Sequence, residues 1–356
     1  MHKKIILAAL FVSFVATTNA QIKWPAITNT TKPWTRWWWE GSAVNKKDLT
    51  WNLEQYQKAG LGGVEITPIY GVYGHEKEFI DFLSPQWMQM LVHTLNESKR
   101  LGLGVDLANA TGWPFGGPWV TDEDASKTIY CKRWYIKGGD PFTSRIEYLQ
   151  DPLVRTANNK PVSADTLLQP VQANKNLQAL ALDQIQFRKK LLLRCLIAYS
   201  TGQQTIDLTS KVDSSGNLTW TAPEGEWYIY GLFEGLHGKM VERAAPGGEG
   251  YAIDHFSSTA ARNYFKRFDQ AFKGYDLSHL RGFFNDSYEV DDARGEANWT
   301  PGFLAEFQKR KGYDLRRYLP SLYGTDKDSD QDRRVIYDYR SVIDELILEN
   351  FTKEWK

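Results

Sequence analysis

Two acidic residues three positions apart, Asp286 and Glu289, follow a short apolar segment at 280–284. The segment has the pattern of a strand, and the two acids stand where that strand would end. Cleavage of a glycosidic bond needs a protonated carboxyl group at the leaving oxygen and a second carboxylate that activates water or attacks the sugar. We predict that Glu289 is the acid, with Tyr288 and Trp299 supplying an apolar setting that favours its protonated form. Asp286 is the runner-up, since Asn-Asp-Ser after a strand can equally be a turn that caps its own backbone.

The second carboxyl group of such a pair has several candidates. Within the chain they are Glu65, Asp106 and Asp254, each of which follows or ends a strand-like segment. The favoured interpretation is a partner beyond Lys356, which predicts that residues 1–356 alone are catalytically impaired.

Other polar and aromatic residues could contact a sugar. Donors and acceptors for vicinal hydroxyls are expected from Asn109, Asp106, Asp254 and His255, and stacking surfaces from Trp39 and Trp113. Two structural interpretations stay open. A histidine beside an acid is more often a structural pair than a sugar ligand, and most tryptophans fill the core.

Alternating strands and helices must position these residues. Strand-like segments at 36–39, 62–67 and 103–107 alternate with helical patterns at 46–59 and 84–101. This βαβ order is typical of a parallel sheet. The strands are expected to end at Glu40, Glu65 and Asp106, and acids at corresponding strand ends favour a (β/α)8 TIM-type barrel with its site at that face. The fold class is therefore α/β, with the N-terminal half of the barrel present.

Four segments describe the predicted organisation. Residues 1–20 form a signal peptide, with a basic start, an apolar stretch at 5–15 and cleavage near Ala20. Residues 21–127 supply barrel strands 1–3, residues 128–237 a β-rich, β-sandwich-like insertion, and residues 238–356 the barrel continuation, with a possible fifth strand near Ile253. The signal peptide predicts a periplasmic or extracellular protein. No segment is long and apolar enough to span a membrane.

Composition narrows the class of partner. The chain has 43 basic and 43 acidic residues, and no basic stripe that would bind nucleic acid. Its 14 tryptophans suit a protein that binds sugar rings. Cys131 and Cys195 are the only cysteines and lie in strand-like segments, so free buried thiols are expected, with one disulfide as the alternative.

The last helical pattern begins near Asp332 and continues to Lys356 without a stop signal. Four or five strands do not close an eight-stranded barrel, which takes about 250 residues of its own. We therefore expect the chain to be a fragment of a longer protein.

Several motifs together carry a family resemblance. They are Arg36-Trp37-Trp38-Trp39, Gly62 to Ile66, the stretch Asn109 to Trp119, Arg243 to Gly250 with Asp254, Asp286-Ser287-Tyr288-Glu289, Asn298-Trp299-Thr300 and Gly312-Tyr313-Asp314. In this order they resemble the α-L-rhamnosidases of glycoside hydrolase family 106, and the stretch Thr111 to Trp119 is the most specific of them.

The resemblance implies a catalytic (α/β)8 barrel followed by β-sandwich domains. It also implies inverting hydrolysis of terminal α-L-rhamnosides of plant polysaccharides or glycosides, with a calcium ion at the active site. Glu65, Asp106 and Asp254 could contribute calcium ligands, although no linear calcium loop is present, and 326–330 resembles one only by alternation. The metal ligands stay undetermined. Two alternatives remain: a barrel glycosidase for another sugar, and a non-catalytic carbohydrate-binding remnant.

Overall fold

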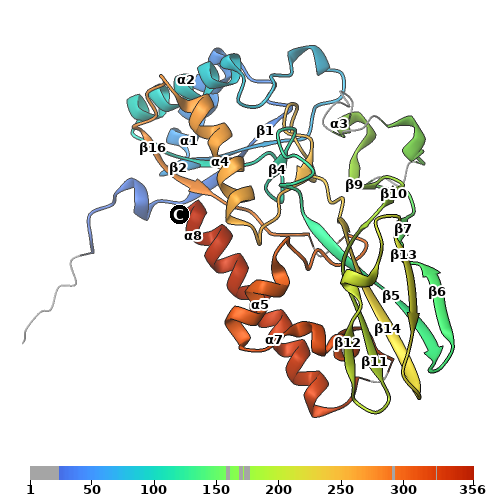
Figure 1. Ribbon diagram of the computed structural model, residues 1–356. Helices are drawn as coiled ribbons and strands as arrows, with labels where there is room; N and C mark the ends of the chain where they lie inside the picture. The colour runs from blue at the N-terminus through green and yellow to red at the C-terminus, as the bar shows by residue number, and fades with distance from the viewer. Residues whose placement is uncertain (1–23, 158–160, 168–170, 172–176, 291–292, 326) are drawn as a thin grey trace, which may run out of the picture.

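A four-stranded parallel sheet forms the centre of one half of the molecule. The computed structural model describes residues 24–157, 161–167, 171, 177–290, 293–325 and 327–356. The sheet has the order β1 (Trp34–Glu40), β2 (Gly63–Ile69), β3 (Gly104–Ala108) and β16 (Leu280–Phe284), and all neighbours are parallel (Figure 1). The expected α/β class is confirmed.

The two faces of this sheet differ in polarity because side chains alternate along each strand. On one face Trp37, Val64 and Val105 are buried in the main hydrophobic core. On the other face the strand register aligns Arg36, Glu65 and Asp106 in one row. The polar row therefore lies on the face away from that core.

Helices begin and end where the sequence places caps. α1 (Lys46–Lys58) follows Asn45, whose side chain accepts a hydrogen bond from the Asp48 N–H. α2 (Pro85–Leu101) begins after Ser84 with proline in its first turn and ends at Gly102, which is left-handed. α4 (Ser258–Phe272) is capped by Ser257. α2 contacts both α1 and α4, so the three helices pack side by side (Figure 1).

The segment near Ile253 does not join the parallel sheet, so of the two alternatives, four or five barrel strands, the fifth strand is not observed. β15 (Tyr251–Ala252) pairs antiparallel with β4 (Gly116–Gly117) instead. A Cβ at Gly116 would lie 2.3 Å from the Tyr251 carbonyl oxygen, so this close pairing requires glycine. Over the described residues the parallel sheet is open, and the closed TIM-type barrel is not observed.

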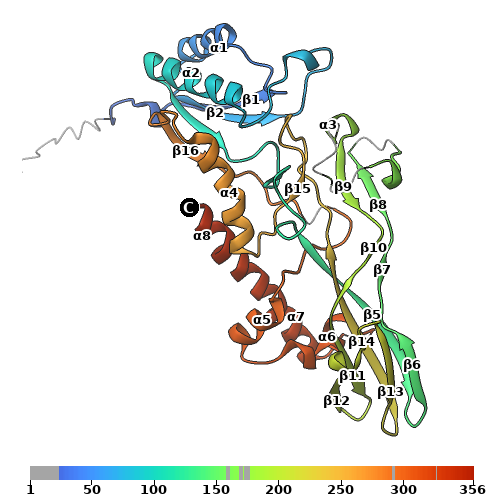
Figure 2. The same cartoon turned by 45° about the horizontal axis from the view of Figure 1, so that its top comes forward.

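Short antiparallel strands make up the β-rich insertion. One sheet has the order β12 (Thr205–Asp207), β11 (Leu192–Ser200), β14 (Glu226–Leu236) and β5 (Lys127–Lys137). The pair β6 (Pro141–Arg145) and β13 (Asn217–Thr221) packs against it through a shared apolar cluster. The smaller elements are β7 (Leu149–Gln150) with β10 (Lys189–Lys190), β8 (Leu153–Thr156) with β9 (Leu182–Gln186), and α3 (Leu177–Leu180). Figure 2 shows this insertion as an elongated arm that points away from the parallel sheet.

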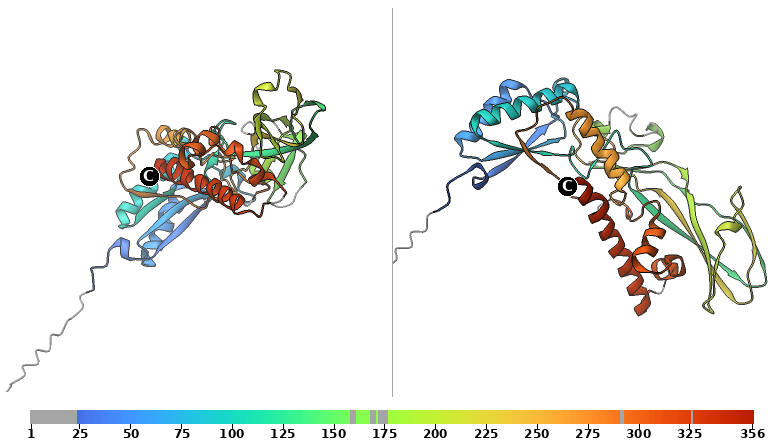
Figure 3. Two further views of the ribbon diagram at one scale, coloured as in Figure 1. Left: turned by 60° about the horizontal axis from the view of Figure 1, so that its bottom comes forward. Right: turned by 60° about the vertical axis from the view of Figure 1, so that its left-hand side comes forward.

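A helical segment packs on the other face of the arm. It comprises α5 (Phe303–Lys311), α6 (Leu319–Tyr323), α7 (Asp330–Leu346), a π-helical turn (Ile347–Thr352) and α8 (Lys353–Trp355). α7, the π-helical turn and α8 form one continuous helix that runs from the arm to the parallel sheet (Figure 3).

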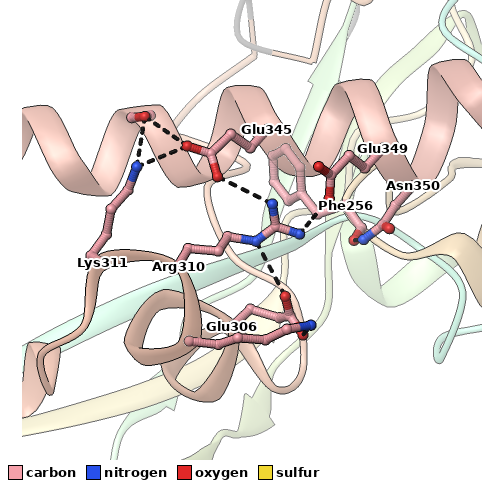
Figure 4. Close-up of polar contacts among 9 residues, drawn as sticks. Phe256, Glu306, Arg310, Lys311, Glu345, Glu349 and Asn350 are labelled. Carbon is pink, nitrogen blue, oxygen red and sulfur yellow. Dashed lines mark hydrogen bonds and ion pairs between the residues drawn. The ribbon is translucent and has the colours of Figure 1, made fainter.

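A network of charged side chains joins α5 to this long helix. Arg310 of α5 binds Glu306 on its own helix, and Glu345 and Glu349 across the interface, at 3.2, 3.1 and 2.7 Å (Figure 4). Lys311 adds a second contact to Glu345 at 2.8 Å. Arg310 is partly buried and binds three glutamates at once, so these pairs link α5 to the long helix.

Two smaller expectations have clear outcomes. Cys131 and Cys195 are free thiols, as predicted. Among the described residues, no helix has both the length and the apolar composition needed to cross a membrane. The predicted signal peptide at 1–20 lies outside the described residues.

Candidate active site

Arg36 connects two of the predicted acids, Glu65 within the parallel sheet and Asp286 in the loop after β16. Its Nε donates to Glu65 Oε1 and its Nη1 to Asp286 Oδ2, both at 2.9 Å. The guanidinium also stacks on Trp38 and Phe284, at 5.1 and 4.7 Å from the ring centroids. Burial raises the pKa of Glu65, and Arg36 opposes this shift. The arginine therefore fixes the loop after β16 to β1 and β2.

Glu289 lies in the loop that follows β16, and its carboxylate accepts hydrogen bonds from two donors. Trp113 Nε1 donates to its Oε2 at 2.5 Å, and Ser287 Oγ donates to its Oε1 at 2.6 Å. The N–H of Ser287 in turn donates to Asp286 Oδ1 at 2.9 Å. Ser287 therefore positions both acids of the predicted pair relative to each other.

Trp113 is placed by a close approach of two glycine-rich segments. Its backbone pairs with Glu242, N to O at 3.2 Å and O to N at 2.7 Å. The preceding Gly112 has φ 65°, and a Cβ there would lie 1.9 Å from the Glu242 carbonyl oxygen. On the indole ring lies the guanidinium of Arg243, at 5.1 Å from the ring centroid. The motifs at 109–119 and 243–250 are therefore two sides of one structure.

Glu65 and Asp106 are not strand ends. Both lie inside their strands, since β2 continues to Ile69 and β3 to Ala108, and only Glu40 ends its strand. Asp106 pairs with Arg281 of β16 and not with Arg36. Glu65 and Asp106 were predicted to end their strands. In the structure they lie side by side in the middle of the sheet, as part of a charged row.

Asp254 and His255 are buried and are not paired with each other. Asp254 is 1% exposed, accepts from Thr300 Oγ1 at 2.6 Å and from the Phe256 N–H at 2.9 Å, and burial raises its pKa to about 6. His255 packs edge-on against Tyr288, and burial lowers its pKa to about 3, so its ring is neutral. This arrangement fits the structural interpretation of both residues, and neither offers a surface to a sugar.

Trp39 and Asn109 also face inward. Trp39 is 1% exposed and packs against Trp87 in the core, so its ring offers no stacking face, contrary to expectation. Asn109 is 5% exposed and its Oδ1 accepts from Trp355 Nε1 at 3.2 Å. Trp299 donates to Glu234 of the insertion at 2.7 Å, so it does not form the expected apolar setting of Glu289.

The acids suggested as calcium ligands do not converge. Arg36 is bound to Glu65, Arg281 is bound to Asp106, and Asp254 is bonded to Thr300 elsewhere. Within the described ranges, no cluster of three or more histidine, cysteine or acidic residues is arranged to hold a metal ion. These residues do not fit calcium as they stand, and no chemical step below uses it.

Sequence reasoning missed three residues of this site. Arg36 could have been found by aligning β1 with β2, because parallel register places it beside Glu65. Ser287 lies between the two acids, where a short donor is easily overlooked. Arg243 begins the motif that runs to Gly250, but no role for it could be predicted, since its contact with Trp113 depends on the pairing of distant segments.

The comparisons with known proteins identify one family. The profile of the family described as α-L-rhamnosidase, glycoside hydrolase family 106, matches residues 26–185 and 197–355. The chain belongs to this family. The sequence-based resemblance is thereby confirmed.

Two further proteins are similar to this chain. A protein of Formosa agariphila named "Putative beta-glucuronidase" is 31% identical over 340 residues, which cover 91% of this chain and 28% of that protein. The structure of a rhamnosidase from Novosphingobium sp. PP1Y superposes with a TM-score of 0.64 at 19% identity, covering 92% of this chain and 44% of that one. The chain thus spans less than half the length of each, and the shared fold is that of a rhamnosidase structure.

Proposed function

We propose that the chain is part of a secreted glycoside hydrolase that cleaves terminal α-L-rhamnosides of plant-type glycans with inversion at the anomeric carbon. Family membership supports the reaction class. The observation that carries the assignment is the hydrogen-bonded position of Glu289, between Trp113 and Ser287 and next to Asp286.

The two donors to Glu289 differ in the hydrogen-bond roles that they can take. An indole N–H can only donate, so Oε2 must remain an acceptor. The Ser287 hydroxyl can donate or accept, so Oε1 can carry a proton and keep its hydrogen bond with Ser287. We assign Oε1 as the atom that delivers the proton to the leaving oxygen. Precise placement of such a group is what acid catalysis requires.

Asp286 supports this group. Its Oδ2 binds Arg36 and its Oδ1 accepts the Ser287 N–H, so both oxygens have donors. The positive charge of Arg36 offsets the negative charge of Asp286 beside Glu289. We propose that Asp286 and Arg36 position the loop, and that Glu289 transfers the proton.

A second candidate function is cleavage of a uronic acid glycoside. The Formosa agariphila relative carries a glucuronidase name at 31% identity. Both functions use the same two-carboxylate chemistry, and the third alternative, sugar binding without turnover, uses none.

A substrate panel separates these functions. The natural protein that contains residues 1–356 is purified and incubated with aryl α-L-rhamnoside, aryl β-D-glucuronide and aryl β-D-glucoside, and the released sugar is followed by proton NMR. The proposal predicts turnover of the rhamnoside, with β-L-rhamnose as the first product. Turnover of the glucuronide alone would show that the substrate is a glucuronide and not a rhamnoside. Release of α-L-rhamnose as the first product would exclude inversion. Binding of the rhamnoside without turnover would support the non-catalytic carbohydrate-binding remnant.

A further inference from the structure

Arg243 is a cation beside the candidate site that has no carboxylate partner among the described residues. The other two arginines of the site are neutralised, Arg36 by Glu65 and Asp286 and Arg281 by Asp106. Arg243 instead donates to the Tyr70 hydroxyl. Its guanidinium lies 5.5 Å from the Tyr70 ring centroid, and it is an exposed residue.

Three acidic residues line the same cavity as Arg243, and each of them is bound to another group. Asp183 and Glu242 both bind the fully buried Lys239. Glu249 accepts the N–H of Gly247 at 2.9 Å. The charge of Arg243 is therefore free to meet an anion from outside.

A cavity opens at this guanidinium. It has a volume of about 230 Å³ and is lined by Arg243, Tyr70, Met240 and Gly250, among other residues. Because the face of Trp113 carries Arg243 and its indole N–H binds Glu289, one side chain separates the two groups. A group bound at Arg243 would therefore belong to the same glycan as the glycosidic bond that Glu289 is proposed to protonate.

The backbone around this arginine is held in an uncommon conformation. Arg243, Tyr70 and Glu289 have φ values of 59°, 48° and 28°, in the region that favours glycine. The Tyr70 N–H donates to the Arg243 carbonyl oxygen at 2.8 Å and so links two of the three. Such conformations cost on the order of 1–3 kcal/mol each and cluster at ligand sites.

We propose that Arg243 binds the carboxylate of a uronic acid in the glycan substrate, with Tyr70 positioning its guanidinium. This inference rests on the proposed function, because it takes Glu289 as the point of bond cleavage. The planar fork of arginine matches a carboxylate with two parallel hydrogen bonds. The carboxylate can come from the sugar that leaves or from the terminal sugar itself.

The test compares acidic and neutral substrates. One arm uses α-L-rhamnosyl galacturonate against α-L-rhamnosyl galactose, with the acid on the leaving sugar. The other uses aryl β-D-glucuronide against aryl β-D-glucoside, with the acid on the terminal sugar. In the arm that is correct, Arg243→Gln lowers the acidic-to-neutral ratio of kcat/KM by about 10- to 100-fold, the range for a hydrogen bond to a charged group.

Two further variants isolate the cause. Arg267→Gln removes another arginine that lies over a tryptophan, at 6.0 Å from the Trp119 centroid, and leaves the ratio within about two-fold. Arg243→Lys keeps the charge without the fork and recovers part of the ratio. An unchanged ratio in Arg243→Gln in both arms overturns the proposal.

Titration calorimetry decides the matter if no substrate is turned over. Galacturonate and galactose are titrated into wild-type protein and into Arg243→Gln. Tighter binding of galacturonate that is lost in the variant supports the carboxylate site while the hydrolase proposal fails. Equal binding of the two sugars overturns the carboxylate site.

Discussion

Replacement of Asp254 by asparagine separates a structural role from a substrate role. The carboxyl group is 1% exposed and its pKa is raised from the usual 3.8 to about 6, mainly by burial. Asparagine can keep both hydrogen bonds, with Oδ1 accepting from the Phe256 N–H and Nδ2 donating to Thr300 Oγ1. The substitution therefore removes a buried charge, together with the attraction of that charge to the Lys127 ammonium group, whose pKa burial lowers and Asp254 raises.

The magnitude follows from the shift in pKa. A folded-state pKa above the unfolded value means that the folded protein binds more protons between about pH 4 and pH 6, so stability falls as pH rises through that window. A shift of about two units corresponds to about 3 kcal/mol, at 1.36 kcal/mol per unit. Asp254→Asn lacks this loss, so its advantage over wild type grows from near zero at pH 4 to as much as about 3 kcal/mol at pH 7.

Urea unfolding of both proteins at pH 4, 5, 6, 7 and 8 measures this difference. The same preparations are assayed for hydrolysis, which the variant should retain. An Asp254→Asn protein that is less stable than wild type at pH 7 would refute the reasoning about the buried charge. If Asp254→Asn loses substrate binding but stays as stable as wild type, the predicted role of Asp254 as a sugar contact would be supported instead.

Three further outcomes are expected. Lys239→Met removes the buried ammonium group that binds Asp183 and Glu242, of which Asp183 keeps its ion pair with Arg155, and lowers the free energy of unfolding by about 3–5 kcal/mol, measured by chemical denaturation. The thiols of Cys131 and Cys195, whose pKa values burial raises to about 12, should react with iodoacetamide at pH 8 only after unfolding, as followed by mass spectrometry. Trp113→Phe removes one hydrogen bond to Glu289 and should lower kcat about 10- to 100-fold with the thermal melt little changed.

Local signals in the sequence predicted the helices and the first three parallel strands well. Asn45 and Ser84 cap their helices as expected, because a cap depends only on neighbouring backbone groups. The strand at 280–284 was also recognised from its own pattern. Pairing partners were harder. The segment at 251–252 has strand character, but its antiparallel partner at 116–117 is a two-residue element that no periodicity marks.

The candidate site was predicted in part. The pair at 286 and 289 is singled out by its place after a strand, and in the structure it lies beside Trp113 and Arg36, while its catalytic role stays a prediction. Trp39 was assigned to the wrong face, since in a run of three tryptophans only the strand register decides which ring points to the core. Arg243 reaches the site through long-range packing, which sequence patterns do not report.

The kinetics of Glu289→Gln test the central claim most directly. Glutamine keeps an oxygen that can accept the Trp113 N–H but cannot deliver a proton. The account predicts that kcat on an α-L-rhamnoside falls by about 10²- to 10⁴-fold with substrate binding retained, while the control Glu296→Gln stays near wild type. Near-normal turnover by Glu289→Gln would contradict the account.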